Sequence, residues 1–345
     1  IVRSKIGNEL QWAQCCLSLF RKSYDFEYGK IESHNRFLDL TPHVEVFLNI
    51  AKTILTADEE QEEIAYLYNK GGFGNRYLGN YSRALEWYCN ALAIREKILG
   101  KEHSDTATNY NNMAVVFHDL GDYVKALEYY GYGLAICEKV LGKEHPDTAT
   151  NYNNMAGVSR AQGDYAKALE YYGYDLAICE KVLGKEHPDT ATNYNNMGEV
   201  FRVQGDNVKA LEYFGYALEI FEKVLGKEHP DTATNYNNMA AVFHAQGDYV
   251  KALEYYSYAL EIFEKVLGKE HPDTATIYNG MAVVFHDQGD YTKALEWYVK
   301  AYRIRLSKLG AKHPNTEATH ENMTKAYNLS GNTMDFEKWL EEQMV

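Results

Sequence analysis

The sequence of 345 residues has few prolines, few cysteines and no strongly basic character. It contains 6 Pro and 5 Cys, and no CxxC motif or Cys/His cluster has the spacing of a metal site. No stretch approaches the roughly 20 consecutive apolar residues of a membrane-spanning helix, and no basic-then-apolar leader opens the chain. The net charge of -14 argues against binding to nucleic acid or anionic membranes, because both need a basic field. We therefore expect a soluble cytoplasmic protein with no nucleic-acid or membrane partner.

What the sequence has in abundance is an internal repeat. The string Gly-Lys-Glu-His recurs with successive His residues 42 positions apart, and Tyr, of which there are 30, follows the same period. A period of this size is typical of a solenoid, in which each unit buries its apolar face on the next. The repeated residues are His103, His145, His187, His229 and His271, and His313 continues the series.

One period predicts two helices. Pro146 opens the first, where the ring is tolerated, and Gly163 ends it in the left-handed conformation. Asp164 caps the second helix, which Gly184 closes. Apolar residues recur at steps of three and four along both segments, so each has one face to bury. Cys137 and Cys179 occupy the phase of Phe221 and Phe263, which predicts small core hydrophobes rather than ligands.

The pattern of one unit resembles the tetratricopeptide repeat. This resemblance implies an all-α fold, an α-solenoid in which helix-turn-helix repeats form a right-handed superhelix with helical caps. The 42-residue form, with its Leu-Gly-Lys-Glu-His-Pro-Asp-Thr-Ala linker, is similar to kinesin light chains and to the C-terminal arrays of STAND-type (NB-ARC) NTPases. The matching residues are Tyr236, Ala240, Phe243, Gly247, Tyr249, Ala252, Tyr256 and Ala259.

The repeats divide the chain into three parts. Residues 1–61 form an N-terminal capping or linker segment, in which we expect one helix from Ser4 to Tyr24 and another that Thr41-Pro42 opens. Its Leu40-Thr41-Pro42-His43 resembles the segment that joins the winged-helix part of STAND NTPases to their repeats, although a plain capping bundle explains the same residues. Residues 62–310 hold six units and residues 311–345 form capping helices. The units are 62–103, 104–145, 146–187, 188–229, 230–271 and 272–310.

No enzyme class fits the sequence. It has no Gly-x-x-x-x-Gly-Lys-Ser/Thr loop, and Leu-Gly-Lys-Glu places Glu where a Mg²⁺-binding hydroxyl is required. The recurring His residues begin separate units, so they cannot converge on one metal ion and are expected to cap helices instead. We expect no catalytic residue, no metal and no cofactor.

The resemblance implies that the first helix of each unit lines a concave groove. Each full unit has one Asn at an inward position, and such amides can clamp a peptide backbone because they both donate and accept. The alternative is that the amides satisfy neighbouring helices. These residues are Asn69, Asn111, Asn153, Asn195, Asn237 and Asn279.

Seven residues further along, the inward position is always basic or titratable. A stripe of this kind favours acidic side chains or a free C-terminal carboxylate, whereas the alternative is a solvated charged face. The stripe consists of Arg76, His118, Arg160, Arg202, His244 and His286.

The units differ from one another at a few inward positions, while linkers and second helices are nearly copied. Groove residues are free to specialise, so we expect these positions to set specificity. They are Val115, Asp119, Gly157, Ala161, Glu199, Val203, Ala241, Ala245, Val283 and Asp287.

These observations favour a scaffold that binds a protein or peptide in the groove, as the ligand-sensing part of a larger STAND-type protein. Two alternatives remain. One is a kinesin-light-chain-like cargo adaptor, and the other is a structural protein that self-associates through the Tyr-rich surface of the second helices. A Walker motif encoded before Ile1 favours the sensor, and a heptad coiled coil there favours the adaptor.

Overall fold

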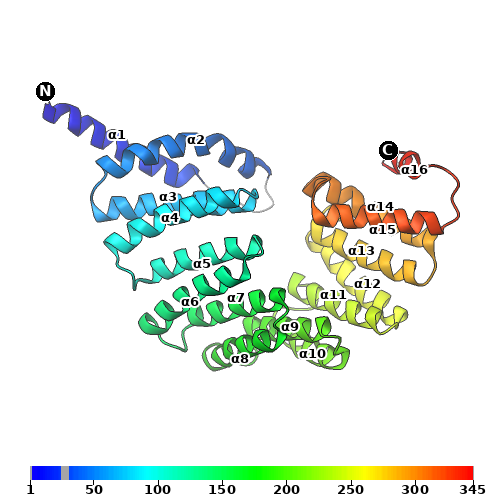
Figure 1. The fold of residues 1–345 in the computed structure, drawn as a ribbon. Coiled ribbons are helices and arrows are strands. Elements are labelled where there is room, and N and C mark those ends of the chain that lie inside the picture. Colours follow the sequence, from blue (N-terminus) through cyan, green and yellow to red (C-terminus); the bar gives the residue numbers. More distant parts are fainter. Residues whose placement is uncertain (1, 25–30, 345) are drawn as a thin grey trace. The chain divides into compact units, whose positions relative to one another are not determined.

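The structure, a computed structural model, describes residues 2–24 and 31–344, which fold into helices joined by short turns (Figure 1). The helices of the described residues are α1 (Val2–Ser23), α2 (Ile31–Ile54), α3 (Asp58–Tyr77), α4 (Tyr81–Ile98), α5 (Ser104–Asp119), α6 (Tyr123–Val140), α7 (Pro146–Gln162), α8 (Tyr165–Val182), α9 (Pro188–Val203), α10 (Asn207–Val224), α11 (Pro230–Ala245), α12 (Tyr249–Val266), α13 (Pro272–Asp287), α14 (Tyr291–Leu309), α15 (Pro314–Leu329) and α16 (Phe336–Gln343).

From α3 onward the helices alternate between two roles. We call the odd-numbered helices α3 to α15 the A helices and the even-numbered helices α4 to α14 the B helices. A helices pack on the B helix that follows, as in α3 with α4 and α11 with α12, and B helices pack on the next A helix, as in α12 with α13. The prediction of an all-α solenoid of helix-turn-helix units is confirmed.

The chain divides into two compact units, one ending at Ile178 and the other beginning at Cys179. Within the first unit, α3 begins at Asp58, ahead of the predicted unit boundary at residue 62. Within the second unit, the last A helix, α15, is followed by the short α16, whose Phe336 and Trp339 pack on Tyr327. The repeat core of each unit therefore ends on helices that lack the full hairpin pattern.

Each A helix from α5 onward begins with the same side-chain cap. His229 Nδ1 accepts a hydrogen bond of 3.1 Å from the backbone N–H of Asp231 at the start of α11. The prediction that the repeated His residues cap these helices is therefore confirmed. The same bond is made by His103, His145, His187, His271 and His313.

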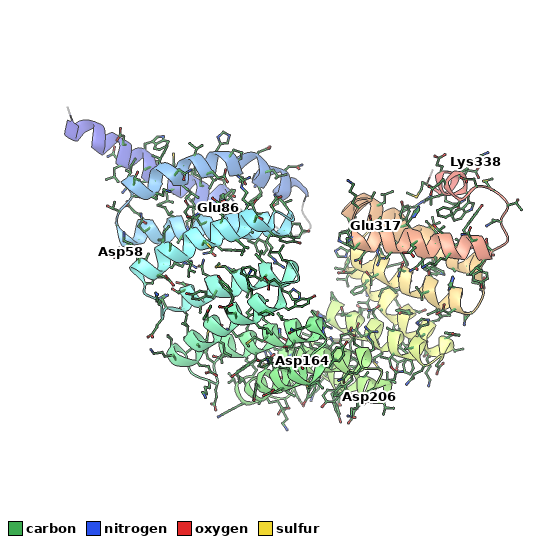
Figure 2. The ribbon with its side chains drawn as sticks, viewed as in Figure 1. Asp58, Glu86, Asp164, Asp206, Glu317 and Lys338 are labelled. Carbon is green, nitrogen blue, oxygen red and sulfur yellow. The ribbon has the colours of Figure 1, made fainter. Side chains whose placement is uncertain are left out.

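Asp residues begin the B helices, and left-handed glycines close the turns. Asp164 Oδ1 accepts from the N–H of Lys167 at 3.1 Å, and Asp206 does the same for Lys209; both Asp residues are labelled in Figure 2. Gly163 ends α7 with φ of 84°, a conformation that costs glycine little. A glycine with φ between 75° and 98° recurs at every such turn from Gly79 to Gly331. These predictions are confirmed.

The N-terminal segment corrects one prediction. α2 begins at Ile31 rather than at Thr41-Pro42, so Pro42 lies inside a helix. Proline there removes one backbone bond, but the loss is tolerated because Phe37 before it and Val44 after it are both buried in one core. Thr41 Oγ1 also donates to the carbonyl of Phe37 at 2.6 Å.

One buried contact recurs between each B helix and the A helix after it, and we call it the junction slot. In the first slot, Arg95 Nη1 donates to Asn109 Oδ1 at 2.7 Å, and Arg95 Nη2 donates to Glu62 Oε1 at 2.7 Å. The predicted burial of Cys137 and Cys179 is confirmed, because both lie in this slot. The B-helix members are Arg95, Cys137, Cys179, Phe221, Phe263 and Arg305, and their A-helix partners are Asn109, Asn151, Asn193, Asn235, Ile277 and Thr319.

Candidate functional site

The inward amides predicted from the sequence are half-buried between neighbouring A helices. Asn195 Oδ1 accepts from Asn235 Nδ2 at 3.3 Å and from Asn238 Nδ2 at 3.0 Å, both on the next A helix. The same arrangement ties α3 to α5, where Asn69 Oδ1 accepts from Asn112 Nδ2 at 3.2 Å. These amides therefore join successive repeats.

The remaining amides have different surroundings. Asn279 Oδ1 accepts from the Thr319 hydroxyl at 3.3 Å, and Asn237 Nδ2 donates to Asn238 Oδ1 at 3.2 Å. Asn111 Oδ1 is buried without a hydrogen-bond partner among the described residues, against the backbone of Gly133. Asn153 also has an interaction partner. Bonding between repeats is thus seen for Asn69, Asn195 and Asn279, and contact of the six amides with a partner stays a prediction.

In the first compact unit, the basic stripe is paired with one of the predicted specificity residues. Arg76 Nε donates to Asp119 Oδ2 at 2.6 Å, and His118 Nδ1 lies 3.6 Å from the same carboxylate. Burial raises the pKa of Asp119, but hydrogen bonds from His118 and Arg76 outweigh it and hold that pKa below its usual value. One carboxylate therefore serves two residues of the stripe.

The second unit repeats this arrangement with histidines. His244 Nε2 lies 2.8 Å from Asp287 Oδ2, and His286 Nδ1 lies 3.0 Å from Asp287 Oδ1. Burial raises the pKa of Asp287, whereas the hydrogen bonds from His286 and His244 together lower it below its usual value. Arg202 is compensated within its own helix, by two bonds of 2.7 Å to Glu199.

The stripe and the specificity positions therefore form one surface of ion pairs. Sequence reasoning treated them as two separate sets. The signal that could have joined them is the spacing, because Arg76 to Asp119 and His244 to Asp287 are both 43 residues apart. Arg160 also has an interaction partner.

The other specificity positions carry no charge. Of these residues, Val115, Gly157, Ala241 and Val283 are half-buried, and Ala161, Val203 and Ala245 are exposed.

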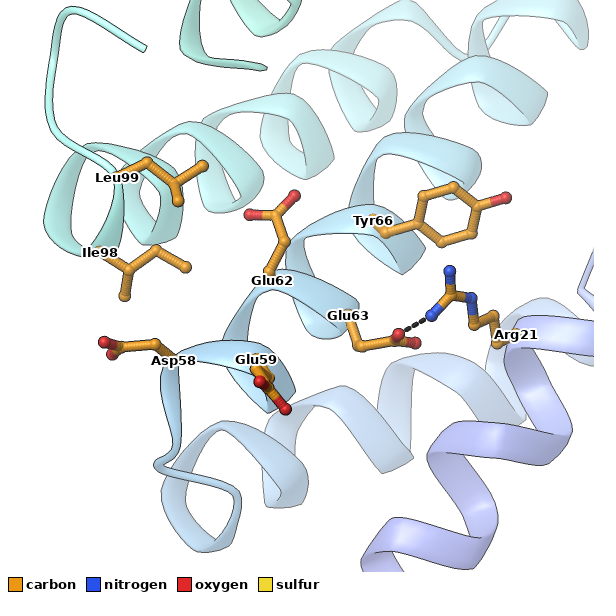
Figure 3. A pocket seen from close by; sticks show the side chains of 8 residues that line it. All are labelled: Arg21, Asp58, Glu59, Glu62, Glu63, Tyr66, Ile98 and Leu99. Atoms are coloured by element: carbon orange, nitrogen blue, oxygen red, sulfur yellow. Dashed lines mark ion pairs between the residues drawn. The ribbon is translucent and has the colours of Figure 1, made fainter. Parts of the chain in front are cut away.

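A cavity of about 520 Å³ lies at the start of α3 (Figure 3). Its wall is acidic, but Arg21 pairs with Glu63, and the Arg21 guanidinium lies 5.5 Å from the ring centroid of Tyr66. Glu62 Oε1, on the opposite wall, accepts from Arg95. The charges here are thus used to hold α1, α3 and α4 together.

No group of three or more His, Cys, Asp or Glu residues in the part of the chain that the structure describes has a geometry that could hold a metal ion. Among the same residues, no helix combines the length and the apolarity needed to cross a bilayer. The geometry on the page is that of a surface built for contact rather than for chemistry.

A stack of antiparallel helix pairs, capped at each turn and tied by side-chain bonds between repeats, defines a helical-repeat protein. The model of the tetratricopeptide repeat matches residues 63–131, 148–189, 176–223, 189–265, 231–307 and 273–333. The chain belongs to the tetratricopeptide repeat family. Proteins of this family are generally non-enzymatic scaffolds for protein-protein interaction.

Solved structures with the same fold come from several contexts. BtubC (BKLC) from P. vanneervenii is 26% identical, with a TM-score of 0.53 over 70% of this chain and 93% of that one. A putative kinesin light chain from Podosopora anserina with nearly identical TPR-like repeats is 24% identical, with a TM-score of 0.50 over 60% of this chain and 98% of that one. A STAND protein with a tetratricopeptide repeat sensor from Pyrococcus horikoshii is 15% identical, with a TM-score of 0.57 over 97% of this chain and 52% of that one. No curated protein matches the sequence.

Proposed function

We propose that the face formed by the A helices binds a peptide or protein partner and that the chain performs no catalysis of its own. The observation that carries this proposal is how the inward amides are used. Asn195 and Asn279 use Oδ1 as an acceptor for the next repeat, and their Nδ2 groups have no partner among the described residues. Their N–H donors are available for carbonyl or carboxylate oxygens of a ligand.

The stripe supports a preference for acidic groups or a free C-terminus. Arg76 uses only Nε in its bond to Asp119, so its terminal nitrogens remain for a second carboxylate. Arg202 uses Nε and Nη2 on Glu199 and retains Nη1. The proposed contact surface comprises the six amides and the stripe, with the variable positions setting selectivity.

Short synthetic peptides with free C-termini, and the same peptides amidated, test the proposal by binding to the full chain. Asn195→Ala is expected to weaken the tightest binders about tenfold, which corresponds to one lost charge-assisted hydrogen bond. Asn235→Ala is the matched control, because it breaks the same bond between repeats but leaves Asn195 on the face. Equal affinity of the Asn195→Ala variant and the parent chain overturns the role of the amides.

We further propose that the chain is the sensor part of a STAND-type protein. Support comes from the likeness to the Pyrococcus horikoshii protein, which extends over 97% of this chain and so includes the lead-in helices α1 and α2. The gene upstream of Ile1 provides the test. A phosphate-binding loop encoded there is the expected result, and a heptad coiled coil instead supports the adaptor alternative.

A further inference from the structure

A cluster of aromatic rings recurs on the side of the repeats opposite in role to the amides, where B helices and linkers meet. In one cluster Tyr236 of α11 lies against Tyr255 and Tyr258 of α12, with ring centroids 5.9 and 5.5 Å from that of Tyr236. These separations are typical of stabilising aromatic pairs. Equivalent clusters are Tyr110, Tyr129 and Tyr132; Tyr152, Tyr171 and Tyr174; and Tyr194, Tyr213 and Tyr216.

The hydroxyl groups of each cluster are held by carboxylates. Tyr258 donates to Glu254 at 2.7 Å, and Tyr216 donates to Glu212 at 2.8 Å. The rings themselves remain accessible, since Tyr258 is 43% exposed and Tyr216 is 45% exposed. The clusters therefore present ring faces and edges in fixed orientations.

Two of these clusters open into cavities in consecutive repeats of the second compact unit. One cavity, of about 510 Å³, is lined by Tyr236, Tyr255, Tyr258, Glu261 and Ile262 among others. The other, of about 220 Å³, is lined by Lys185, Tyr194, Tyr216, Glu219 and Ile220. Tyr194, Tyr216, Glu219 and Ile220 each lie 42 positions before a counterpart in the larger cavity. The chain thus builds one kind of pocket twice.

Both cavities gain a carboxylate that the earlier repeats lack. Glu219 and Glu261 stand where the preceding repeats have Ala135 and Ala177. Neither Glu has an ion pair among the residues that the structure describes, whereas the cavity lysine Lys265 is neutralised by Glu228 at 2.6 Å. An uncompensated negative charge therefore lies beside exposed aromatic rings, in a chain whose net charge is already -14.

The last repeat shows what this ring pair accepts. There the equivalents of Tyr236 and Tyr255 are Tyr278 and Trp297, and Lys300 replaces Tyr258. The ammonium of Lys300 lies 4.1 Å from the ring centroid of Trp297 and 5.8 Å from that of Tyr278. Cations at such distances are attracted to the ring face. The chain thus places its own cation on the aromatic pair where no third ring is present.

We propose that the two cavities of α10, α11 and α12 hold lysine or arginine side chains from a basic segment of a partner protein. The ring faces supply cation–π attraction, and Glu219 and Glu261 supply the opposite charge. Two pockets in consecutive repeats fit two basic residues of one segment. The surface lies apart from the A-helix face, so this proposal stands or falls independently of the proposed function.

A labelled oligolysine peptide tests the proposal on the full chain, with the acetyl-lysine peptide as the uncharged control. Oligolysine is expected to bind at least tenfold more tightly than its acetylated form. Tyr258→Leu is expected to weaken oligolysine binding about fivefold to tenfold, and Tyr258→Phe, which keeps the ring, is expected to retain most of it. Circular dichroism checks that each variant is folded.

Non-specific attraction to an acidic chain is separated by charge-matched variants. Glu219→Ala with Glu261→Ala is expected to weaken oligolysine binding at least threefold more than Glu317→Ala with Glu341→Ala, which removes two exposed carboxylates elsewhere. Equal effects of the two double variants, equal binding by the Tyr258→Leu variant, or no binding of oligolysine to the parent chain each overturn the proposal.

Discussion

The junction slots at the ends of the repeat array differ in chemistry from those in the middle. At the first slot, Arg95 bonds Asn109 and Glu62, and at the last, Arg305 Nη1 donates to the Thr319 hydroxyl at 2.6 Å. Between them, Phe221 faces Asn235, whose Oδ1 has no hydrogen-bond partner among the described residues. One geometric position can thus be filled by a hydrogen-bond network or by apolar packing.

The difference teaches how repeats with the same backbone divide their roles. End hairpins have a neighbour on one side only and use a long cation to connect three segments. Middle hairpins are covered on both sides and can leave one amide oxygen unpaired, at a cost that packing offsets. Substitutions at the slot are therefore expected to have large effects at the ends and small effects in the middle.

Arg95→Ala is expected to produce the largest loss. Arg95 is 6% exposed, and its removal leaves Glu62 and Asn109 without their cationic partner. The free energy of unfolding is expected to fall by about 3 kcal/mol, as for other broken buried pairs. Urea denaturation, with hydrogen exchange of α3 and α4, measures it. A loss below about 1 kcal/mol contradicts the special role of the end slot.

Replacement of the slot amide sharpens the comparison directly. Asn109→Ile removes the acceptor of Arg95 and the donor to the Tyr88 carbonyl, so a loss of about 2 kcal/mol is expected. Asn235→Ile is expected to change the stability by less than about 1 kcal/mol, because it also removes a buried oxygen that has no partner. Ile277 already fills this position one repeat later. Similar losses for both variants refute the distinction.

The histidine caps are expected to be equivalent in the two regions. His103→Ala at an end and His229→Ala in the middle each remove one N-terminal cap and are expected to cost about 1 kcal/mol. Asn in place of either His retains a capping acceptor and is the matched control. Thermal unfolding compares the variants, and unequal costs mean that the caps also contribute to packing between repeats.

The smallest expected effect is the pH dependence of the stripe. The pKa of Asp287 is lowered from the usual 3.8, so its ionised form contributes stability above that pH. This contribution is lost as the pH falls below 3.8, through the lower pKa of the folded state. Relative to the parent chain, Asp287→Asn is expected to lose about 0.5 kcal/mol near neutral pH, a difference that vanishes at lower pH. A difference independent of pH contradicts the role of the ionised carboxylate.

Much of the fold could be predicted because it depends on local signals repeated many times. The capping His and Asp residues and the turn glycines act within a few residues, so their roles follow from the sequence alone. The N-terminal segment was harder, because α2 continues through Pro42 only where Phe37 and Val44 are held in the same core. Local propensity there is overridden by tertiary packing.

The candidate site was less predictable for a related reason. The helical periodicity assigns Asn195 and Asp287 to a face, but it does not reveal which side chain of the next helix each one meets. Asn195 meets Asn235 and Asn238, and Asp287 meets His244, because neighbouring A helices are offset along their axes. The aromatic cavities were missed because they combine residues of three consecutive helices with a single variable position, Glu219 or Glu261.

The left-handed turn glycines set a constraint on how such a chain can change in length. From Gly79 to Gly331 they follow one another at intervals of 21 residues, so each helix with its turn occupies the same span. Loss or gain of a few residues shifts every downstream contact, whereas loss of one 42-residue segment joins ends that already fit. The array is therefore expected to shorten or lengthen by whole hairpins through genetic exchange, with the remaining hairpins still in register.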